Sequence, residues 1–173
     1  MRDRRDILLQ AVGLGASAYL ASASALAQSE HKEPELPKVG QVLTLPETSL
    51  LSGASFKPAL ADGKLTVIYW WASWCPFCMV QSPHIEALWK AHQSRGLQML
   101  TFSIDKTEQA AKDYLQKKSY TFPAAMLSPA ITRVLPKPKG LPVVIVRGKD
   151  GRVKHAEAGE MFPEDIEKIG QWV

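Results

Sequence analysis

Continuous apolar runs alternate with segments of helical spacing along the chain from residue 65 onward. Residues 65–71 are almost uninterruptedly apolar, which is typical of a strand buried on both faces of a sheet. Residues 75–95 then place apolar side chains at helical intervals, with a bend expected at Pro83 and a stop at Gly96. The pattern predicts a central strand that leads directly into a long helix.

The same alternation continues to the end of the chain. Strands are predicted at 97–104, 122–127, 143–146 and 152–158, and helices at 107–118, 129–135 and from 163 onward. Thr107 is a plausible helix cap, and the triplet at 149–151 is typical of a hairpin turn. These elements predict an α/β sandwich with a central mixed sheet and helices on both faces.

The region before residue 65 is less regular. Residues 39–64 alternate short apolar pieces with Pro and Gly, which indicates a short hairpin or an edge strand. Residues 28–38 carry Glu and Pro with few apolar side chains, so we expect an extended linker that stays outside the core.

The first 27 residues have the pattern of an export signal. A basic start is followed by small and apolar residues and by Ala25-Leu26-Ala27, a cleavage motif. Arg4-Arg5 resembles a twin-arginine signal, although Sec export remains open. The 21 residues from Ile7 to Ala27 could alternatively stay as an uncleaved anchor. We favour cleavage and expect a domain at 39–173 that works in the periplasm.

Length and charge limit the function classes. A chain of 173 residues with 46% hydrophobic composition suits one domain and a targeting segment. The formal net charge of +4 falls to +3 without residues 1–27, which leaves 18 basic and 15 acidic residues. So mild a charge argues against a nucleic-acid partner.

The only two cysteines, Cys75 and Cys78, stand at the predicted start of the helix after the central strand. This arrangement is typical of a redox-active dithiol. Free N–H groups and the helix dipole favour an anion at that position, so we expect Cys75 to be the acidic, exposed nucleophile. Cys78, one turn later and more buried, would resolve the mixed disulfide. Pro76 fits the first turn because its missing N–H would have had no partner.

Other uses of the cysteines are weaker. A permanent structural disulfide across so short a loop would restrict the unfolded chain little. A metal site lacks a second cysteine pair, and we interpret the histidines as solvated or capping residues: His31, His84, His92 and His155. The sequence therefore predicts no metal and no cofactor.

The run WASWCPFC at residues 71–78 resembles the active site of thioredoxin-fold thiol–disulfide oxidoreductases, and most closely their exported TlpA/ResA-like branch. Pro83, the Gly-Leu-Pro at 140–142 and the turn at 149–151 match further features of that branch. The helix and strand within 107–127 resemble its characteristic insertion. The resemblance covers residues 39–173. The chain lacks the proline-threonine-cysteine arrangement of peroxiredoxins.

The resemblance implies a fold, a site and a set of partners. Pro142 would be a cis-proline beside the cysteines, and Leu141 would lend its backbone to an extended substrate segment. Trp74, Pro76 and Phe77 would form the surface that meets a partner. Protein thiols and disulfides are the implied partners, with a membrane protein as electron donor. Apocytochrome c or copper-site cysteines are the implied substrates of a reductase.

Two alternatives use the same cysteines. A net dithiol oxidase would run the reaction in the opposite direction. A Cu(I) metallochaperone would hold the metal between two soft thiolates, with Met79 adjacent.

Two positions depart from the pattern of the resembled proteins. Tyr69 stands where thioredoxins have a buried Asp and this branch commonly has Asn, and Gln81 stands where the branch often has Glu. No carboxylate is therefore found where a base for Cys78 would be expected. Glu86 and Asp62 are the nearest alternatives in sequence, and our hypothesis is that a water or a more distant group takes the proton.

Overall fold

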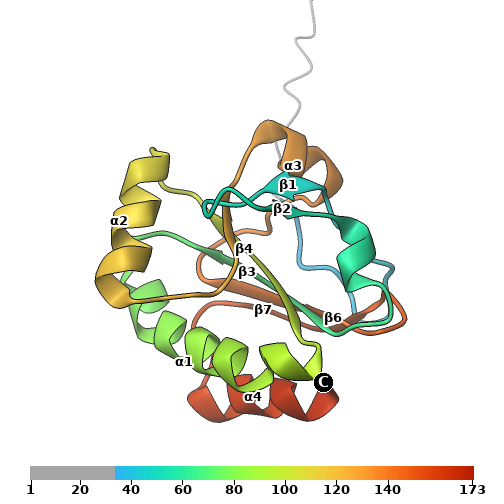
Figure 1. Ribbon diagram of the computed structural model, residues 1–173. Helices are drawn as coiled ribbons and strands as arrows, with labels where there is room; N and C mark the ends of the chain where they lie inside the picture. The colour runs from blue at the N-terminus through green and yellow to red at the C-terminus, as the bar shows by residue number, and fades with distance from the viewer. Residues whose placement is uncertain (1–33) are drawn as a thin grey trace, which may run out of the picture. The chain divides into compact units, whose positions relative to one another are not determined.

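The computed structural model describes residues 34–173 (Figure 1). The expected export signal at 1–27 and the first part of the expected linker lie outside the described residues. No helix within the described part of the chain is long and apolar enough to cross a membrane.

A five-stranded mixed sheet forms the centre, as the sequence predicted. Its strand order is β5-β4-β3-β6-β7. Their bounds are β3 Thr66–Trp71, β4 Gln98–Ser103, β5 Ala124–Met126, β6 Val143–Arg147 and β7 Val153–Ala158. Strands β4 and β5 run parallel to β3, whereas β6 and β7 are antiparallel to their neighbours. The strand that leads to the cysteines is therefore the central one.

All six side chains of β3 are buried because both faces of the sheet are covered. Tyr69 and Trp71 belong to the hydrophobic core on one face. Ile68 and Trp70 belong to the core on the other. Successive residues of a strand point to opposite faces, which explains why this segment is apolar without alternation.

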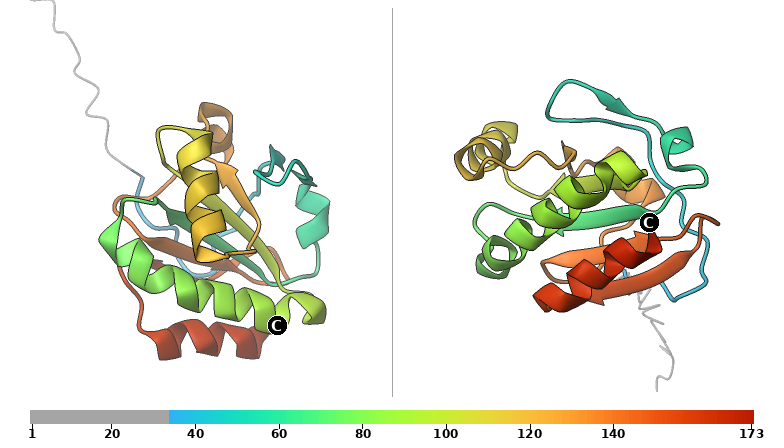
Figure 2. Two further views of the ribbon diagram at one scale, coloured as in Figure 1. Left: turned by 60° about the vertical axis from the view of Figure 1, so that its left-hand side comes forward. Right: turned by 60° about the horizontal axis from the view of Figure 1, so that its bottom comes forward.

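Three helices cover the first face: α1 (Pro76–His92), α2 (Glu108–Lys118) and α4 (Pro163–Ile169). Helices α1 and α4 lie side by side, as both further views also show (Figure 2). The chain ends in the short helix η3 (Gly170–Trp172).

The other face is covered by the predicted hairpin of β1 (Thr48–Ser49) and β2 (Ser55–Phe56), by η1 (Pro58–Ala61) and by α3 (Pro129–Val134). Arg147, at the end of β6, hydrogen-bonds to this N-terminal region. Its Nε donates to the carbonyl of Leu43 at 3.0 Å and its Nη1 to that of Ala61 at 3.1 Å.

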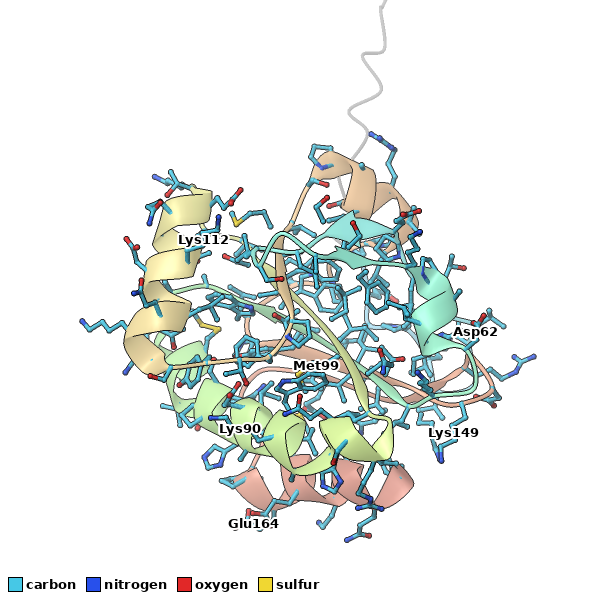
Figure 3. The ribbon with its side chains drawn as sticks, viewed as in Figure 1. Asp62, Lys90, Met99, Lys112, Lys149 and Glu164 are labelled. Atoms are coloured by element: carbon cyan, nitrogen blue, oxygen red, sulfur yellow. A yellow bond between two sulfur atoms is a disulfide. The ribbon has the colours of Figure 1, made fainter. Side chains whose placement is uncertain are left out.

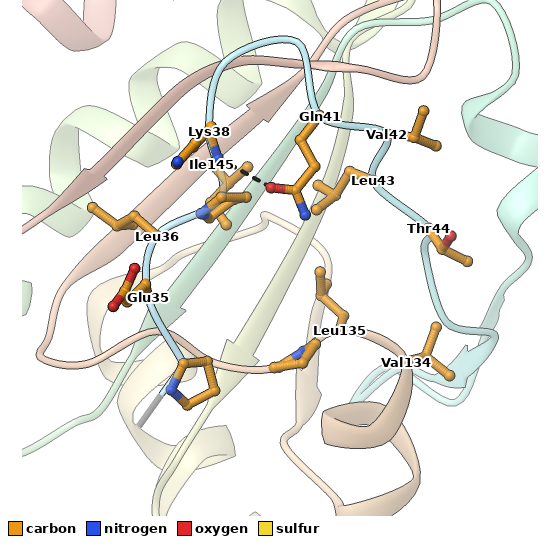
Figure 4. Close-up of a pocket in the computed structure, with 13 residues that line it drawn as sticks. Glu35, Leu36, Lys38, Gln41, Val42, Leu43, Thr44, Val134, Leu135 and Ile145 are labelled. Atoms are coloured by element: carbon orange, nitrogen blue, oxygen red, sulfur yellow. Dashed lines mark hydrogen bonds between the residues drawn. The ribbon is translucent and has the colours of Figure 1, made fainter. Parts of the chain in front are cut away.

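The described end of the expected linker differs from the prediction. Leu36 packs against the second core, and the N–H of Lys139 donates to the carbonyl of Pro34 at 3.3 Å. Residues 34–38 also line a groove with the end of α3 (Figure 4). One apolar side chain between two prolines is enough to dock here, because the prolines restrict the unfolded chain and lower the entropy lost on ordering.

The element boundaries agree with the pattern to within a few residues. Helix α1 stops at His92 and continues as η2 (Gln93–Arg95), and Gly96 follows with φ of 101°. The Thr107 hydroxyl caps α2 by accepting from the N–H of Ala110 at 3.2 Å. Strand β5 is shorter than predicted at its start because the N–H of Phe122 donates to a side chain, that of Glu86.

Candidate active site

The two cysteines form a disulfide at the start of α1. Cys75 is the N-cap residue, with an extended backbone, and Pro76 occupies the first turn. The Cys75 Sγ accepts from the N–H of Cys78 at 3.2 Å, which is one of the N–H groups that a helix start leaves without a backbone partner. The Cα atoms lie 5.2 Å apart. The helix therefore places the Cys75 sulfur where a negative charge is favoured.

Burial of the pair follows the expected order but not the expected extent. Cys78 is fully buried and Cys75 is 4% exposed, so the prediction of an exposed Cys75 is wrong for the disulfide-bonded state. The reason is that the Cys75 side chain turns back over the first turn of α1 to reach Cys78. The flanking Trp74 and Phe77 are 59% and 58% exposed. They leave apolar surface beside a nearly buried disulfide.

The segment before β6 brings the predicted cis-proline to the same end of the sheet. The Leu141–Pro142 peptide bond is cis, as expected. Val143 pairs with Trp70 near the end of β3, so Pro142 lies beside the strand end from which the chain runs to Cys75. The carbonyl of Pro142 accepts from the N–H of Gly159 at 2.8 Å.

A buried carboxylate that the sequence reasoning missed anchors the loop between β3 and α1. Asp105 accepts from the N–H of Ser73 at 3.2 Å and from its hydroxyl at 2.7 Å. The hydroxyl of Ser103 donates to the same carboxylate at 2.7 Å. Asp105 follows β4, the parallel neighbour of β3, and the ends of parallel neighbours share one edge of a sheet. That placement was the signal that could have revealed it.

Tyr69, on the central strand β3, hydrogen-bonds to helix α1. Its hydroxyl lies 3.0 Å from the Ser82 Oγ and donates to the carbonyl of Cys78 at 3.5 Å. Burial raises the pKa of Tyr69 far above its ordinary value of 10.0, so the hydroxyl stays protonated at neutral pH. Tyr69 therefore positions the turn that carries Cys78 and does not act as a base there.

Gln81 links α1 to the segment before α4. It is 1% exposed, and its Oε1 accepts from the N–H of Met161 at 2.7 Å. Met161 and both cysteines belong to one core cluster. The amide thus lies inside the layer that holds the disulfide.

Neither carboxylate that we considered as a base bonds to Cys78. Glu86 accepts from the N–H and hydroxyl of Thr121, from the N–H of Phe122 and from Lys90. Burial alone would raise the pKa of Glu86, but these hydrogen bonds outweigh it and the pKa is lowered. Asp62 lies where the chain approaches the start of β3 (Figure 3), whereas the cysteines follow its end. The water-mediated route stays a hypothesis.

The groove in Figure 4 is not part of this site. Its lining residue Ile145 belongs to the core on the face opposite α1. Within residues 34–173 no three His, Cys, Asp or Glu side chains are grouped as metal ligands would be.

Comparison with known proteins decides the family. The model of the AhpC/TSA family matches residues 41–129. This chain belongs to the AhpC/TSA family. By its family and its named relatives it is a thiol–disulfide oxidoreductase of thioredoxin fold, and it carries a Cys-Pro-Phe-Cys disulfide at a helix start.

Among curated relatives, the sporulation thiol-disulfide oxidoreductase A of Bacillus subtilis is 23% identical over 97% of this chain and 98% of its own length. The thiol-disulfide oxidoreductase ResA of Bacillus cereus is 26% identical over 68% of each protein.

Solved structures agree on the fold. A thioredoxin-family thiol:disulfide interchange protein from Chlorobium tepidum superposes with a TM-score of 0.71 at 21% identity, covering 78% of this chain and 97% of its own. StoA from Bacillus subtilis superposes with a TM-score of 0.61 at 20% identity, covering 77% and 98%. The helix α2 and strand β5 of the AhpC/TSA member described here form where the sequence predicted a helix and a strand within residues 107–127.

Proposed function

We propose that this AhpC/TSA member is an exported oxidoreductase that reduces disulfides in partner proteins, with Cys75 as nucleophile and Cys78 as resolving residue. The observation that carries the proposal is the position of Cys75 as the N-cap of α1, where its sulfur accepts an N–H of the first turn. A thiolate at that place gains from the same N–H group and from the helix dipole. Cys78 lacks this position and is fully buried.

The exchange takes two displacement steps. The Cys75 thiolate attacks one sulfur of the partner disulfide, the partner S–S bond breaks, and the leaving partner sulfur takes up a proton. Cys78 then loses its proton and attacks the Cys75 Sγ, which breaks the mixed disulfide and releases the second partner thiol. Two electrons pass from the protein dithiol to the partner, and the protein is left with the Cys75–Cys78 disulfide seen here.

The surface beside the disulfide suits an extended protein segment. Trp74 and Phe77 are exposed apolar side chains, and aromatic residues are enriched where proteins meet. Pro76 stands between them in the chain and occupies the first turn of α1. The backbone at Leu141 and Pro142 borders the same end of the sheet. The partner would lie along this backbone with its disulfide over Cys75.

The proposed export of the protein and the proposed direction of the reaction rest on the sequence. The pattern of residues 1–27 supports a cleaved signal, and residues 28–33 would lead from it to the described domain. In the periplasm a reductase needs electrons from elsewhere, which we assign to a membrane donor. Apocytochrome c and metal-site cysteines are both substrates compatible with the resemblance, which selects neither.

Trapping with single-cysteine variants tests the assignment. Cys78→Ser should accumulate partners as mixed disulfides on Cys75, because the residue that would release them is gone. Cys75→Ser is the matched control and should trap little, since Cys78 is fully buried. Stronger trapping by Cys75→Ser would reverse the two roles, and no trapping by either variant would contradict the proposed exchange.

A further inference from the structure

The side-chain amide of Gln81 has one end satisfied and one end without a partner. Its Oε1 accepts from the N–H of Met161 at 2.7 Å. Its Nε2 is buried and has no hydrogen-bond partner in the described part of the chain. A buried donor without an acceptor loses its hydrogen bonds to water without replacement, so this nitrogen calls for an explanation.

The orientation of the amide is fixed by its partner. A backbone N–H can only donate, so the atom that faces Met161 must be the carbonyl oxygen of Gln81. The two N–H groups of Nε2 therefore point away from Met161. They lie in the core layer that Met161 shares with Cys75 and Cys78.

Helix geometry indicates the missing acceptor. Gln81 follows Cys78 by three residues on α1, and residues at this spacing are neighbours on one face of a helix. In the structure the Cys78 sulfur is held in the disulfide, where it is only a weak acceptor. We propose that Nε2 of Gln81 donates a hydrogen bond to the Cys78 sulfur once the disulfide is reduced, and thereby stabilises the thiolate that resolves mixed disulfides.

The inference deepens the proposed function and rests on it. After the partner has joined Cys75, the Cys78 thiol must lose its proton before it attacks, and that proton ends on a released partner thiol. Gln81 takes no proton in this step. It contributes a donor to the charged sulfur, and hydrogen bonds to charged groups are the stronger ones. Nε2 has no partner in the disulfide state, so the gain on reduction favours the dithiol and raises the reduction potential.

Two substitutions separate this role from packing. Gln81→Met removes the donor and also the contact with Met161, but that contact is lost equally from both redox states and cancels in the potential. Gln81→Glu keeps an acceptor for the Met161 N–H and removes the donor. Gln93→Met and Gln93→Glu are matched controls, because Gln93 is an exposed residue just beyond the end of the same helix.

We expect the equilibrium of Gln81→Met with glutathione to shift about tenfold toward the disulfide, which corresponds to about 30 mV. In the Cys75→Ser background the same change should raise the pKa of Cys78. Gln81→Glu should shift both quantities in the same direction and further, whereas the Gln93 variants should leave both unchanged. Wild-type values in Gln81→Met would overturn the inference, even if Gln81→Glu were shifted by its charge alone.

A measurement on the unmodified protein covers the case in which Gln81→Met does not fold. The side-chain amide NMR signals of Gln81, assigned by their loss in Gln81→Glu, should move and exchange more slowly with solvent on reduction. Signals that stay unchanged would overturn the inference. A wild-type pair that does not exchange with glutathione at all would instead contradict the proposed function.

Discussion

At the scale of single residues, the site depends on polar groups that lie far from the cysteines in the sequence. Asp105 stands 30 residues after Cys75 in the sequence, yet it binds Ser73 directly before the redox motif. Distance along the chain indicates Glu86 and Asp62 as the nearest alternative carboxylates. The fold instead brings Asp105 to the site through the parallel pairing of β3 and β4.

Asp105→Ala should therefore destabilise the protein and disturb the redox loop. It leaves the N–H and hydroxyl of Ser73 and the hydroxyl of Ser103 without their acceptor. We expect the free energy of unfolding to fall by about 2–3 kcal/mol, measured by denaturant unfolding of the disulfide form. The rate at which a small dithiol reduces the disulfide should also change, because the loop that presents Cys75 is no longer held.

Asp113→Ala is the matched control, since Asp113 is exposed on α2 and bonds only to Gln109 among the described side chains. It should stay within about 0.5 kcal/mol of wild type. Equal effects of the two substitutions would contradict the role given to Asp105.

At the scale of elements, hydrophobic spacing predicted most of the fold. The apolar run before the cysteines, the long helix after them and the hairpin after Pro142 all formed as expected. Hydrophobic spacing did not predict the structure where a single side-chain contact joins distant segments. Phe122 gives its N–H to Glu86 and not to a strand, and Leu36 docks where composition indicated a tether. Such contacts join distant segments, so a local pattern does not contain them.

The active site was likewise predictable only in those features that a local sequence pattern contains. The cysteines, the helix start and the cis-proline were predictable from the motif and its resemblance. The near burial of Cys75 and the unpartnered nitrogen of Gln81 were not. The first follows from the bond of Cys75 to Cys78, and the second from how α1 packs against the segment before α4; no spacing along the chain records either.

The cap of α2 gives a test at this scale. Thr107→Ala removes the hydroxyl that accepts from the N–H of Ala110 and should lower the free energy of unfolding by about 1 kcal/mol. Thr107→Ser keeps the acceptor and should stay close to wild type in the same unfolding experiment. A loss of stability that is as large in Thr107→Ser would mean that the methyl group, and not the cap, is what matters.

At the scale of the whole molecule, Glu86 connects the active-site helix to the segment before β5. Its carboxylate accepts from Thr121, from Phe122 and from Lys90. These bonds lower its pKa from the ordinary value of 4.5, against the effect of burial. A lowered pKa means that the ionised carboxylate stabilises the fold above pH 4.5, and that this contribution is lost as the pH falls through the folded-state value.

Glu86→Gln makes this dependence measurable. At neutral pH the variant should be less stable than wild type by about 1–3 kcal/mol, because it loses the charged acceptor. Below pH 4.5 the two unfolding free energies should converge, since the wild-type carboxyl becomes protonated. Denaturant unfolding over a pH series gives the comparison, and a difference that stays constant down to acid pH would contradict the assigned role.

The reduction potential of the Cys75–Cys78 couple tests the central claim most directly. It can be measured by equilibration in glutathione buffers with tryptophan fluorescence as the readout, because Trp71 and Trp74 lie in the chain just before the disulfide. We predict a value closer to the −270 mV or so of thioredoxin than to the roughly −120 mV of a strong disulfide donor. A value near the latter would contradict a reductase and would make this protein a source of disulfides.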